Sequence, residues 1–584
     1  KHLGNISLMS RKNKSRRVQI LKITYSFVYI MKDKTQSLNL LIEESIKKNW
    51  DSMALSDMGG INYQYKDVAE TIVKLHIMFK AAGVKKGDRV AICGKNSSNW
   101  VVVLLACLTS GVVAVPVLHE FKPDTVMHLV NHSGAKLLFV DAAIWENLDD
   151  RCMPDLVAAI FISEFGMPLS RSEKLTETRN NINECFGKEF PYDFTRDAVK
   201  YQEDEPEQLA IINYTSGSTG MSKGVMLPYR SLWSNIRYCL DNIDYLHAGD
   251  GIVNMLPLAH LYGMTIESLH PFCQGCHLNF LTKLPSPKVI LKAFEEVKPK
   301  LIISVPLILE KIIRSKVFPM LEKPLMKVLL HIPYVDDRLL AKVKENLLQA
   351  FGGNVREVII GGAPLNPDVE KFLYRIEFPV TVGYGMTECG PLLTYAPATE
   401  AKPHTVGRMM DRMECRIDSP DPAQIPGNIW VKGPNVMQGY YKNRKATEEV
   451  MPDNSGWMNT GDMGVIDEDG FLTIMGRSKT MILGPSGQNI YPEEIEAKLN
   501  NLPYVAESLI IDNHGELEAL VYPDLEVLAK EKIDREKTDK IMHENLETLN
   551  QELPSYSKVK KLKIMSEEFE KTPKRSIKRF LYQP

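Results

Sequence analysis

A segment dense in glycine, serine and threonine, Tyr214–Gly224, holds the residues best suited to chemistry. Successive backbone N–H groups and hydroxyls there can turn toward one anion, and small residues let the main chain approach a polyphosphate closely. Lys223 would add a positive charge for the outer phosphates. Ser222 stands where a Walker A motif needs glycine, and no dinucleotide-binding fingerprint is present. We therefore expect a phosphate-binding loop of another kind, directly after a strand-like run at Leu209–Ile212.

Further motifs follow this segment in a fixed order. They are Leu256–Gly263, Gly361–Pro364, Gly383–Glu388, Trp457–Asp462 and Gly476–Lys479. With these six motifs, the sequence resembles the adenylate-forming superfamily, which includes AMP-forming acyl-CoA synthetases, luciferases and peptide-synthetase adenylation domains. The resemblance runs from about residue 35 to the end of the chain, and it is greatest to bacterial long-chain fatty acid–CoA ligases.

The resemblance implies a reaction between a carboxylate and the α-phosphorus of ATP, with loss of pyrophosphate. Both reactants are anions, so catalysis depends on charge neutralisation and positioning more than on an acid–base pair. Lys223, Thr387 and Glu388 are the implied catalytic residues, and Glu388 is the implied ligand of Mg²⁺, a cation that prefers oxygen ligands. The implied phosphate contacts are Thr215, Ser216, Gly217, Ser218, Thr219 and Gly220.

The resemblance also implies the contacts to the rest of the nucleotide and to the acid. Glycines on both sides of Tyr384 leave its ring free for adenine to stack on; the neighbouring contacts are Gly383, Gly385, Gly361, Gly362 and Ala363. Asp462, which we expect in a polar turn after Gly461, would accept hydrogen bonds from the ribose hydroxyls, with Arg477 as a second contact. His260 would lie in the substrate site among residues that suit an apolar acyl chain.

The second half-reaction, attack of the CoA thiol on the acyl adenylate, is expected to follow rotation of a small C-terminal domain. Lys479 matches the hinge position of the family, and Gly487–Glu494 resembles the stretch near which pantetheine passes. One departure is clear. Most relatives have a lysine where this chain has Ser576, so either Lys574 or Lys578 substitutes for it, adenylation is slower, or the C-terminal pattern is out of register.

Alternating strands and helices must position these motifs. Strands are predicted at Arg89–Cys93, Val112–Val117, Lys136–Val140, Lys300–Ser304 and Glu357–Ile360, with a buried helix at Trp100–Thr109. A mixed-charge helix with Met542, Leu546, Leu549 and Leu553 on one face is predicted near the C-terminus. We expect an α/β fold: a large domain of stacked sheets with flanking helices over 31–476, a hinge at 477–480 and a small mobile α+β domain over 481–584.

Composition limits the class of protein. The 584 residues are 44% hydrophobic and 25% charged, and the net charge of −2 argues against a nucleic-acid partner. Nine scattered cysteines indicate free thiols and a cytoplasmic location. The Cys273–His277 run has the form of a haem attachment motif, which we attribute to chance. The uncharged stretch Trp100–Leu118 is interrupted by Gly111 and Pro116, so it predicts buried core rather than a membrane span.

Residues 1–30 carry seven Lys and Arg and no acid. This basic extension matches nothing in the family, and we interpret it as translated upstream sequence before Met31 rather than as a targeting peptide or lipid-binding arm. Peripheral membrane contact and the oligomeric state are left open.

The sequence thus predicts a ligase that activates a fatty acid with ATP and Mg²⁺ and transfers the acyl group to CoA. Long-chain acids are the predicted substrate class. Three alternatives stay open: an acyl-AMP ligase that loads a carrier protein, a ligase for aryl or short acids, and a weakened acyl-adenylate-binding protein, which Ser576 would allow.

Overall fold

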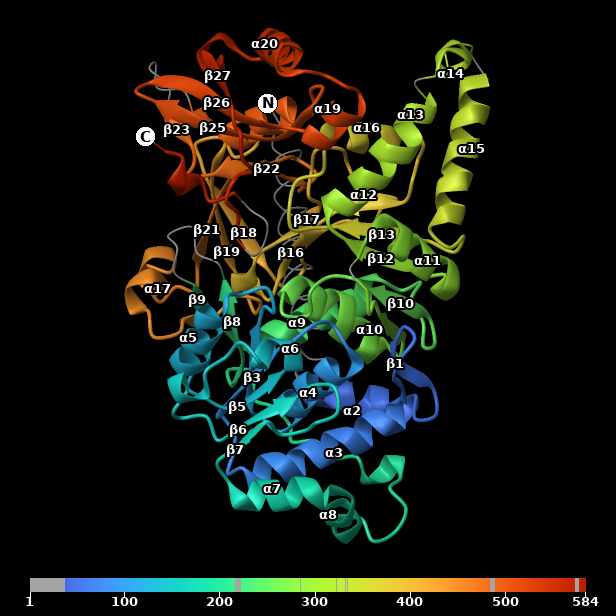
Figure 1. Ribbon diagram of the computed structural model, residues 1–584, viewed down its shortest axis with the longest axis vertical. Helices are drawn as coiled ribbons and strands as arrows, with labels where there is room; N and C mark the ends of the chain where they lie inside the picture. The colour runs from blue at the N-terminus through green and yellow to red at the C-terminus, as the bar shows by residue number, and fades with distance from the viewer. Residues whose placement is uncertain are drawn as a thin grey trace, which may run out of the picture.

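The computed structural model describes residues 37–215, 222–283, 285–321, 323–330, 332, 335–483, 489–572 and 577–583. The basic extension and five of the predicted phosphate contacts, Ser216–Gly220, lie outside the described residues, as do Lys574 and Ser576. The described part is an α/β protein with a large N-terminal domain and a small C-terminal domain, the latter red and at the upper end of the long axis in Figure 1.

An eight-stranded sheet forms the base of the large domain. Its order is β20 (Gly439–Tyr440), β9 (Lys223–Pro228), β8 (Leu209–Thr215), β4 (Val113–Val117), β3 (Arg89–Cys93), β5 (Ala135–Val140), β6 (Ala158–Phe161) and β7 (Leu169–Ser170). The central strands are parallel, whereas β8–β9, β9–β20 and β6–β7 are antiparallel pairs. The helices of this region are α2 (Leu38–Lys48), α3 (Tyr65–Ala81), α4 (Ser98–Thr109), α5 (Pro123–Ser133), α6 (Ala142–Trp145), α7 (Glu173–Asn180), α8 (Ile182–Glu189) and α9 (Tyr229–Asn242), with short 3₁₀ turns at Asp150–Cys152 and Arg196–Ala198.

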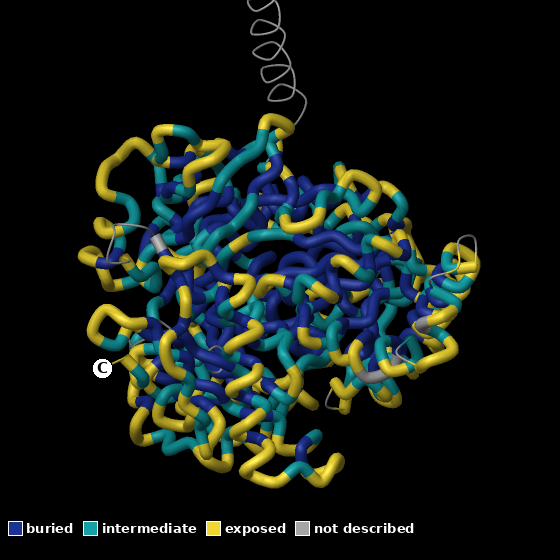
Figure 2. Tube along the Cα trace, turned by 90° about the horizontal axis from the view of Figure 1, so that it is seen from above, coloured by how far each residue is buried: buried dark blue, intermediate teal, exposed yellow. Residues whose placement is uncertain are grey.

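The predicted buried helix and strand at Trp100–Val117 are confirmed as α4 and β4. Every residue of α4 is buried, which explains why its sequence is apolar on all sides. Ser97 caps the helix by accepting a hydrogen bond from the backbone N–H of Trp100. The buried residues form a continuous band through the large domain, dark blue in Figure 2. No helix in the described part of the chain has both the length and the apolar character that a bilayer crossing requires.

Four smaller sheets complete the large domain. They are β10 (Gly251–Asn254), β11 (His277–Phe280), β1 (Met53–Asp57) and β2 (Asn62–Gln64); β12 (Leu301–Ser304), β13 (Glu357–Ile360) and β14 (Val380–Val382); β15 (Tyr384–Gly385), β16 (Leu392–Tyr395) and β17 (Arg408–Met409); and β18 (Glu414–Asp418), β19 (Gly427–Lys432), β21 (Met458–Ile466) and β22 (Leu472–Arg477). Their helices are a π-helix at Tyr262–Leu269, α10 (His270–Gln274), α11 (Pro287–Val297), α12 (Pro306–Ile312), a π-helical turn at Ile313–Val317, α13 (Phe318–Leu321), α14 (Pro324–Leu329), α15 (Val335–Ala350), α16 (Pro367–Arg375), a 3₁₀ turn at Thr387–Cys389 and α17 (Arg444–Val450).

In the described residues the small domain has two sheets of its own. Its elements are β23 (Ile482–Leu483), β24 (Asn489–Ile490), α18 (Pro492–Leu499), β25 (Val505–Asn513), β26 (Glu516–Pro523), α19 (Leu525–Lys530), α20 (Arg535–Glu552) and β27 (Lys561–Ile564), with 3₁₀ turns at Ser555–Ser557 and Arg579–Leu581. The sheets are the pair β23–β24 and the three-stranded sheet β25–β26–β27. The predicted amphipathic helix is α20: Met542, Leu549 and Leu553 are buried in the small domain's core, and Leu546 packs against it. Asn501 accepts hydrogen bonds from Arg314 and Asn366 and so links the two domains.

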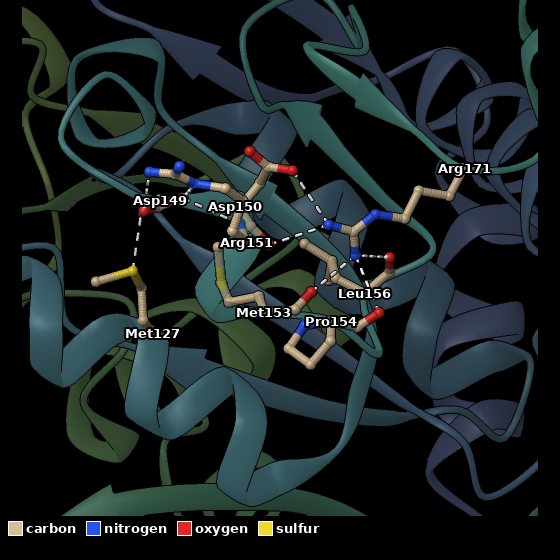
Figure 3. A network of polar contacts seen from close by, with 8 residues as sticks. All are labelled: Met127, Asp149, Asp150, Arg151, Met153, Pro154, Leu156 and Arg171. Atoms are coloured by element: carbon tan, nitrogen blue, oxygen red, sulfur yellow. Dashed lines mark hydrogen bonds and ion pairs between the residues drawn. The ribbon is translucent and has the colours of Figure 1, made fainter.

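The Arg171 side chain joins two segments at one edge of the large domain. The Arg171 guanidinium donates to the carbonyl oxygens of Met153 (2.8 Å), Pro154 (3.1 Å) and Leu156 (2.8 Å), and also bonds Asp150 (Figure 3). One side chain thereby holds the loop before β6 against the segment that follows β7.

The cysteines, all of them in the described residues, form no disulfide bonds, and those of the haem-like motif are buried or hydrogen-bonded within the protein. All nine are unpaired, as the sequence predicts. In the Cys273–His277 run, burial raises the pKa of the Cys273 thiol to about 12. The Cys276 thiol is hydrogen-bonded to the His247 carbonyl, and the His277 ring is hydrogen-bonded to Ser56, so these residues serve packing.

Candidate active site

The predicted phosphate segment begins and ends within a β-hairpin. Thr215 is the last residue of β8 and faces Lys223, the first residue of β9. The prediction that all of Tyr214–Gly224 forms a loop is therefore wrong at both ends, because antiparallel pairing extends to Thr215 and resumes at Lys223. The close approach requires glycine at 224, where a Cβ would lie 2.9 Å from Ile212 Cγ2. The hairpin thus holds Thr215 and Lys223 opposite each other.

Lys223 and Glu388 are brought together by a tyrosine that sequence reasoning missed. The Lys223 Nζ lies 4.9 Å from the centre of the Tyr440 ring, and the Tyr440 hydroxyl donates to Glu388 Oε1 at 2.8 Å. Tyr440 reaches this point because β20 pairs with β9 and sets Tyr440 opposite Val225. Burial and the nearby Glu388 carboxylate raise the pKa of Tyr440, so its hydroxyl stays a proton donor.

Thr387 and Glu388 begin a short 3₁₀ turn directly after β15. The backbone N–H of Met437 donates to the Glu388 carbonyl (2.9 Å), which ties this turn to the strand that carries Tyr440. No cluster of three or more metal-ligating side chains occurs in the described ranges. Glu388 therefore stands as a single carboxylate beside a lysine and a tyrosine.

The glycine-rich residues predicted to flank adenine lie at the carboxyl ends of neighbouring parallel strands. Gly361, Gly362 and Ala363 follow β13, and Gly383 follows β14. The Gly383 N–H donates to the Ile360 carbonyl (2.9 Å), so the two segments are adjacent. In such sheets, ligands bind at the carboxyl ends of strands. At Gly361 a Cβ would lie 3.0 Å from the Tyr262 ring, so only glycine fits there without a shift.

Tyr384 begins a polar chain toward the small domain. Its hydroxyl donates to Asp462 Oδ2 at 2.6 Å, and Arg477 Nε lies 3.2 Å from Asp462 Oδ1. Burial raises the pKa of Asp462, while the Arg477 charge and the Tyr384 hydroxyl oppose that rise. Arg477 is 68% exposed and Asp462 only 7%, so this carboxylate is held by its neighbours while the guanidinium faces solvent.

The prediction that Asp462 lies in a polar turn is wrong, because it belongs to β21 and pairs with Arg477 of β22. Gly461 has a left-handed φ of +76°, which bends the strand locally. This explains why the sequence around it resembles that of a turn. Asp462 and Glu388 are close enough for the Glu388 charge to raise the pKa of Asp462. The predicted phosphate contact Glu388 and the predicted ribose contact Asp462 thus lie in the same region of the large domain.

His260 precedes the π-helix, in a loop that side-chain hydrogen bonds of Asn213 and Tyr262 hold in place. Asn213 of β8 donates to the Ala259 carbonyl (2.8 Å), and the Tyr262 hydroxyl donates to the Ile359 carbonyl (3.1 Å). The loop therefore bridges the phosphate hairpin and β13. Its His260 is partly buried.

Glu267 braces the start of the same loop and was missed from sequence. It is fully buried, and its carboxyl oxygens accept from the backbone N–H groups of Met255 (3.1 Å) and Leu256 (3.0 Å). Burial raises its pKa well above the usual range, and these two hydrogen bonds oppose the rise. A glutamate within an otherwise apolar stretch is the only sequence signal that could have identified it.

The remaining predicted residues lie in the C-terminal part of the chain. Lys479 is exposed in a turn after β22, where the Thr480 and Met481 N–H groups donate to the Arg477 carbonyl. Lys578 forms an ion pair with Glu570 of its own domain at 3.0 Å. The structure therefore does not bring Lys578 to Glu388. Of the predicted pantetheine stretch Gly487–Glu494, the first two residues lie outside the described ranges.

A carboxylate–tyrosine pair, the partly buried Glu388 and the buried Tyr440, lies beside Lys223 of the β8–β9 hairpin, as a nucleotide-binding enzyme site would require. Two family patterns match this chain: "AMP-binding enzyme" over residues 42–441 and "AMP-binding enzyme C-terminal domain" over residues 479–582. The chain belongs to the AMP-binding enzyme family, and the predicted resemblance to adenylate-forming acyl-CoA synthetases is confirmed.

Relatives and solved structures agree with this assignment. The chain is 28% identical over 498 residues to a long-chain-fatty-acid–CoA ligase of Escherichia coli O6:H1, covering 81% of this chain and 82% of that protein. It is also 28% identical over 493 residues to a probable 4-coumarate–CoA ligase of Dictyostelium discoideum, with the same coverage. The fold is similar to ATP-bound MatB from Rhodopseudomonas palustris, with a TM-score of 0.72, 23% identity and coverage of 94% and 98%.

Proposed function

We propose that the protein is an AMP-forming fatty acid–CoA ligase. A fatty acid carboxylate attacks the α-phosphorus of ATP to give acyl-AMP and pyrophosphate, and the CoA thiol then displaces AMP to give the thioester. Similarity to named long-chain ligases from Escherichia coli and Arabidopsis thaliana supports a long-chain acid. The free cysteines support a reducing cytoplasmic location.

The contact between Tyr440 and Glu388, beside Lys223, is the observation that carries this proposal. Adenylation joins two anions, so the site must neutralise charge while holding the reactants in line. Lys223 supplies a positive charge at the mouth of the phosphate hairpin, and Tyr440 fixes the Glu388 carboxylate at 2.8 Å. Tyr384 and Asp462 supply the corresponding polar groups at the ribose side.

The residues present fit a magnesium ion. Mg²⁺ is commonly held by one or two carboxylates together with substrate phosphates rather than by an all-protein cage. Glu388 offers one carboxylate whose Oε1 accepts from Tyr440, and Thr387 adjoins it. When bound, the ion would offset the charge of the ATP phosphates. Lys223 and the hairpin would hold the same phosphates from the other side.

The acyl end would lie along the His260 loop. In the sequence, His260 is flanked by the buried residues Leu258 and Leu261 and is followed by Tyr262, residue types that suit an apolar chain leading to a carboxylate. Asn213 and Tyr262 fasten this loop to both nucleotide-binding segments. The acid would thus be held in a fixed position relative to ATP.

The small domain would serve the second half-reaction. Lys479 lies between β22 and the small-domain elements, so a backbone change there would swing that domain over the site. We keep Lys574 and Lys578 as candidates for the charge absent at Ser576. The Lys578–Glu570 ion pair would have to open for Lys578 to act.

Release of AMP from ATP tests this function. Purified protein with Mg²⁺, CoA and fatty acids of graded length should release AMP only when both acid and CoA are present, with the highest kcat/KM for long chains. 4-Coumarate serves as the aryl competitor, because a probable coumarate ligase is equally similar. A phosphopantetheinylated carrier in place of CoA tests the carrier-loading alternative. Preference for coumarate or the carrier would overturn the proposal.

A further inference from the structure

His132, on the last turn of α5, contacts the β8–β9 hairpin from outside the candidate site. The helix α5 lies beside β8 and β9 in Figure 1. The His132 Nδ1 is hydrogen-bonded to the Tyr214 hydroxyl at 2.7 Å. Tyr214 is the first residue of the glycine-rich segment; it is buried, and the proposed reaction makes no use of it. A histidine thus holds the residue with which the predicted phosphate-binding segment begins.

Tyr214 lies on the face of the hairpin that is turned toward α5, which we call the rear face. Tyr214 pairs with Gly224, and the next pair along the two strands is Thr215 with Lys223. Successive residues of a strand point to opposite faces of the sheet, so Thr215 and Lys223 belong to the front face. A Cβ at Gly224 would lie 3.1 Å from Tyr214 Cε1, so the Tyr214 ring packs directly on this glycine. The bond to His132 therefore holds the hairpin from its rear face.

The segment that follows β20 is held in the same way. The Tyr441 N–H donates to the Gly224 carbonyl at 2.7 Å, and the Tyr441 ring meets the His132 ring edge-on, with centroids 5.7 Å apart. Lys442 Nζ donates to the His132 carbonyl oxygen at 2.8 Å. The preceding residue, Tyr440, points to the front face, toward the predicted phosphate contacts. His132 therefore contacts, from behind, both segments that carry the charged end of the site.

The bond between His132 and Tyr214 fits a neutral imidazole. Burial raises the pKa of Tyr214, so its hydroxyl keeps the proton that it donates. An imidazole with its proton on Nε2 can accept that bond at Nδ1. Burial, the Lys442 charge and His128 lower the pKa of His132, which favours the neutral form. His128 lies one turn earlier on α5, and its ring stacks on the His132 ring at 5.8 Å.

We propose that His132 is a positioning residue for adenylation. Through Tyr214 and Tyr441 it keeps the β8–β9 hairpin and the segment after β20 in place, so that Lys223 and Tyr440 keep their contact on the front face. A buried hydroxyl without a partner is costly, so loss of the bond would displace Tyr214 and the strand that carries it. The inference rests on the proposed function, because it places the ATP phosphates on the front face.

ATP binding and acid-dependent pyrophosphate exchange by the full chain test this inference. His132→Leu keeps an apolar side chain of similar size without the acceptor. It should raise the Kd of Mg²⁺-ATP in calorimetry about tenfold and lower exchange by a similar factor. His132→Asn offers an oxygen close to the position of Nδ1 and should bind ATP within about threefold of wild type. His128→Leu is the matched control, because His128 is exposed on the same helix and should behave like wild type.

Tyr214→Phe removes the other half of the bond and only one oxygen atom, so it provides the same test where His132→Leu does not fold. Because both residues act through one hydrogen bond, H132L/Y214F should bind ATP no more weakly than H132L. A purely structural role for His132 would lower the Tm of His132→Leu and His132→Asn alike and would leave the ATP affinity of the folded protein unchanged.

The outcomes separate this inference from the proposed function. Exchange by wild type that does not depend on the acid would refute the proposed function, while ATP binding by the variants would still test His132. Wild-type ATP affinity in His132→Leu, an equal loss in His128→Leu, or losses that add in H132L/Y214F would refute the positioning role and leave the proposed ligase intact.

Discussion

Tyr440 connects the two charged groups of the predicted phosphate end, Lys223 and Glu388, through its ring face and its hydroxyl. Its hydroxyl donates to Glu388, and its ring lies under the Lys223 ammonium. Hydrogen bonds to ionised groups are stronger than neutral ones, and they fix direction as well as distance. At the residue scale, the site therefore depends on a side chain that has no reactive chemistry of its own.

Tyr440→Phe should keep the ring under Lys223 and remove the bond to Glu388. We expect pyrophosphate exchange to fall about tenfold, because a hydrogen bond to a charged group contributes roughly 1.5–3 kcal/mol. The neighbouring Tyr441→Phe is the control, since the Tyr441 hydroxyl makes only a long bond of 3.4 Å to Ser133. Equal exchange rates in both variants would show that Tyr440 does not orient Glu388.

Arg477→Gln should change the pH dependence of adenylation. In the proposed function Asp462 accepts hydrogen bonds from ribose, for which it must be ionised. Arg477 opposes the rise that burial causes in the pKa of Asp462. Removing the guanidinium therefore raises that pKa further, so the acid limb of kcat/KM for ATP should move to higher pH. Arg444→Gln, on an exposed helix where Arg444 pairs with Glu448, should leave the limb in place. A shift to lower pH would contradict the assignment.

The π-helix at Tyr262–Leu269 is the element that would set the acyl side of the proposed site. Its Tyr262 packs on Gly361 and donates a hydrogen bond to the Ile359 carbonyl of β13. Its Glu267 accepts hydrogen bonds from the two backbone N–H groups that follow β10. The wide helical turn carries both side chains inward over a short stretch. Such single-turn irregularities are frequent at functional sites.

Glu267→Gln should make the stability of the protein less dependent on pH. Burial raises the folded-state pKa of Glu267 well above its usual value of 4.5. A carboxyl whose pKa rises on folding favours the folded state at low pH, and this contribution is lost as pH rises above 4.5. The Tm difference between variant and wild type should therefore shift in favour of the variant as pH increases toward neutrality. Glu184→Gln, on the exposed side of α8, should show no such trend.

Sequence patterns predicted which strands and helices form better than they predicted the residues at which each begins and ends. Arg89–Cys93 and Glu357–Ile360 are strands with the predicted bounds, because short β-branched runs between turn residues have one favourable conformation. The polar residues around Gly461 looked like a turn, yet long-range pairing with β22 makes them strand. Tyr440 could not have been predicted, since its role arises from β20 pairing with a strand over two hundred residues earlier.

The whole molecule consists of a site on one domain and a second domain at its rim. Asp462 and Arg477 lie on the last two strands before the small domain, and Asn501 of the small domain bonds Arg314 and Asn366 of the large one. The two predicted ribose contacts thus lie where the chain leaves the large domain. Any rotation about residues 477–480 would bring a different surface of the small domain to face Asp462 and Arg477.

Lys479→Pro should separate the two half-reactions. Proline fixes φ near −65°, so the backbone at 479 could no longer change between the two domain positions. We expect pyrophosphate exchange within about twofold of wild type and thioester formation reduced about tenfold or more. Lys479→Ala, which removes the side chain but keeps the backbone free, should form thioester like wild type. Equal loss in both variants would assign the effect to the side chain rather than to hinge motion.

The central claim is that one site uses ATP to join a fatty acid to CoA. The most direct test is the stoichiometry of purified wild-type protein with ATP, Mg²⁺, a long-chain fatty acid and CoA, measured as AMP, pyrophosphate and acyl-CoA in one reaction. We expect AMP, pyrophosphate and acyl-CoA in equal amounts, and no sustained formation of any of them when either the acid or CoA is omitted. Formation of ADP, or AMP release that does not require CoA, would contradict it.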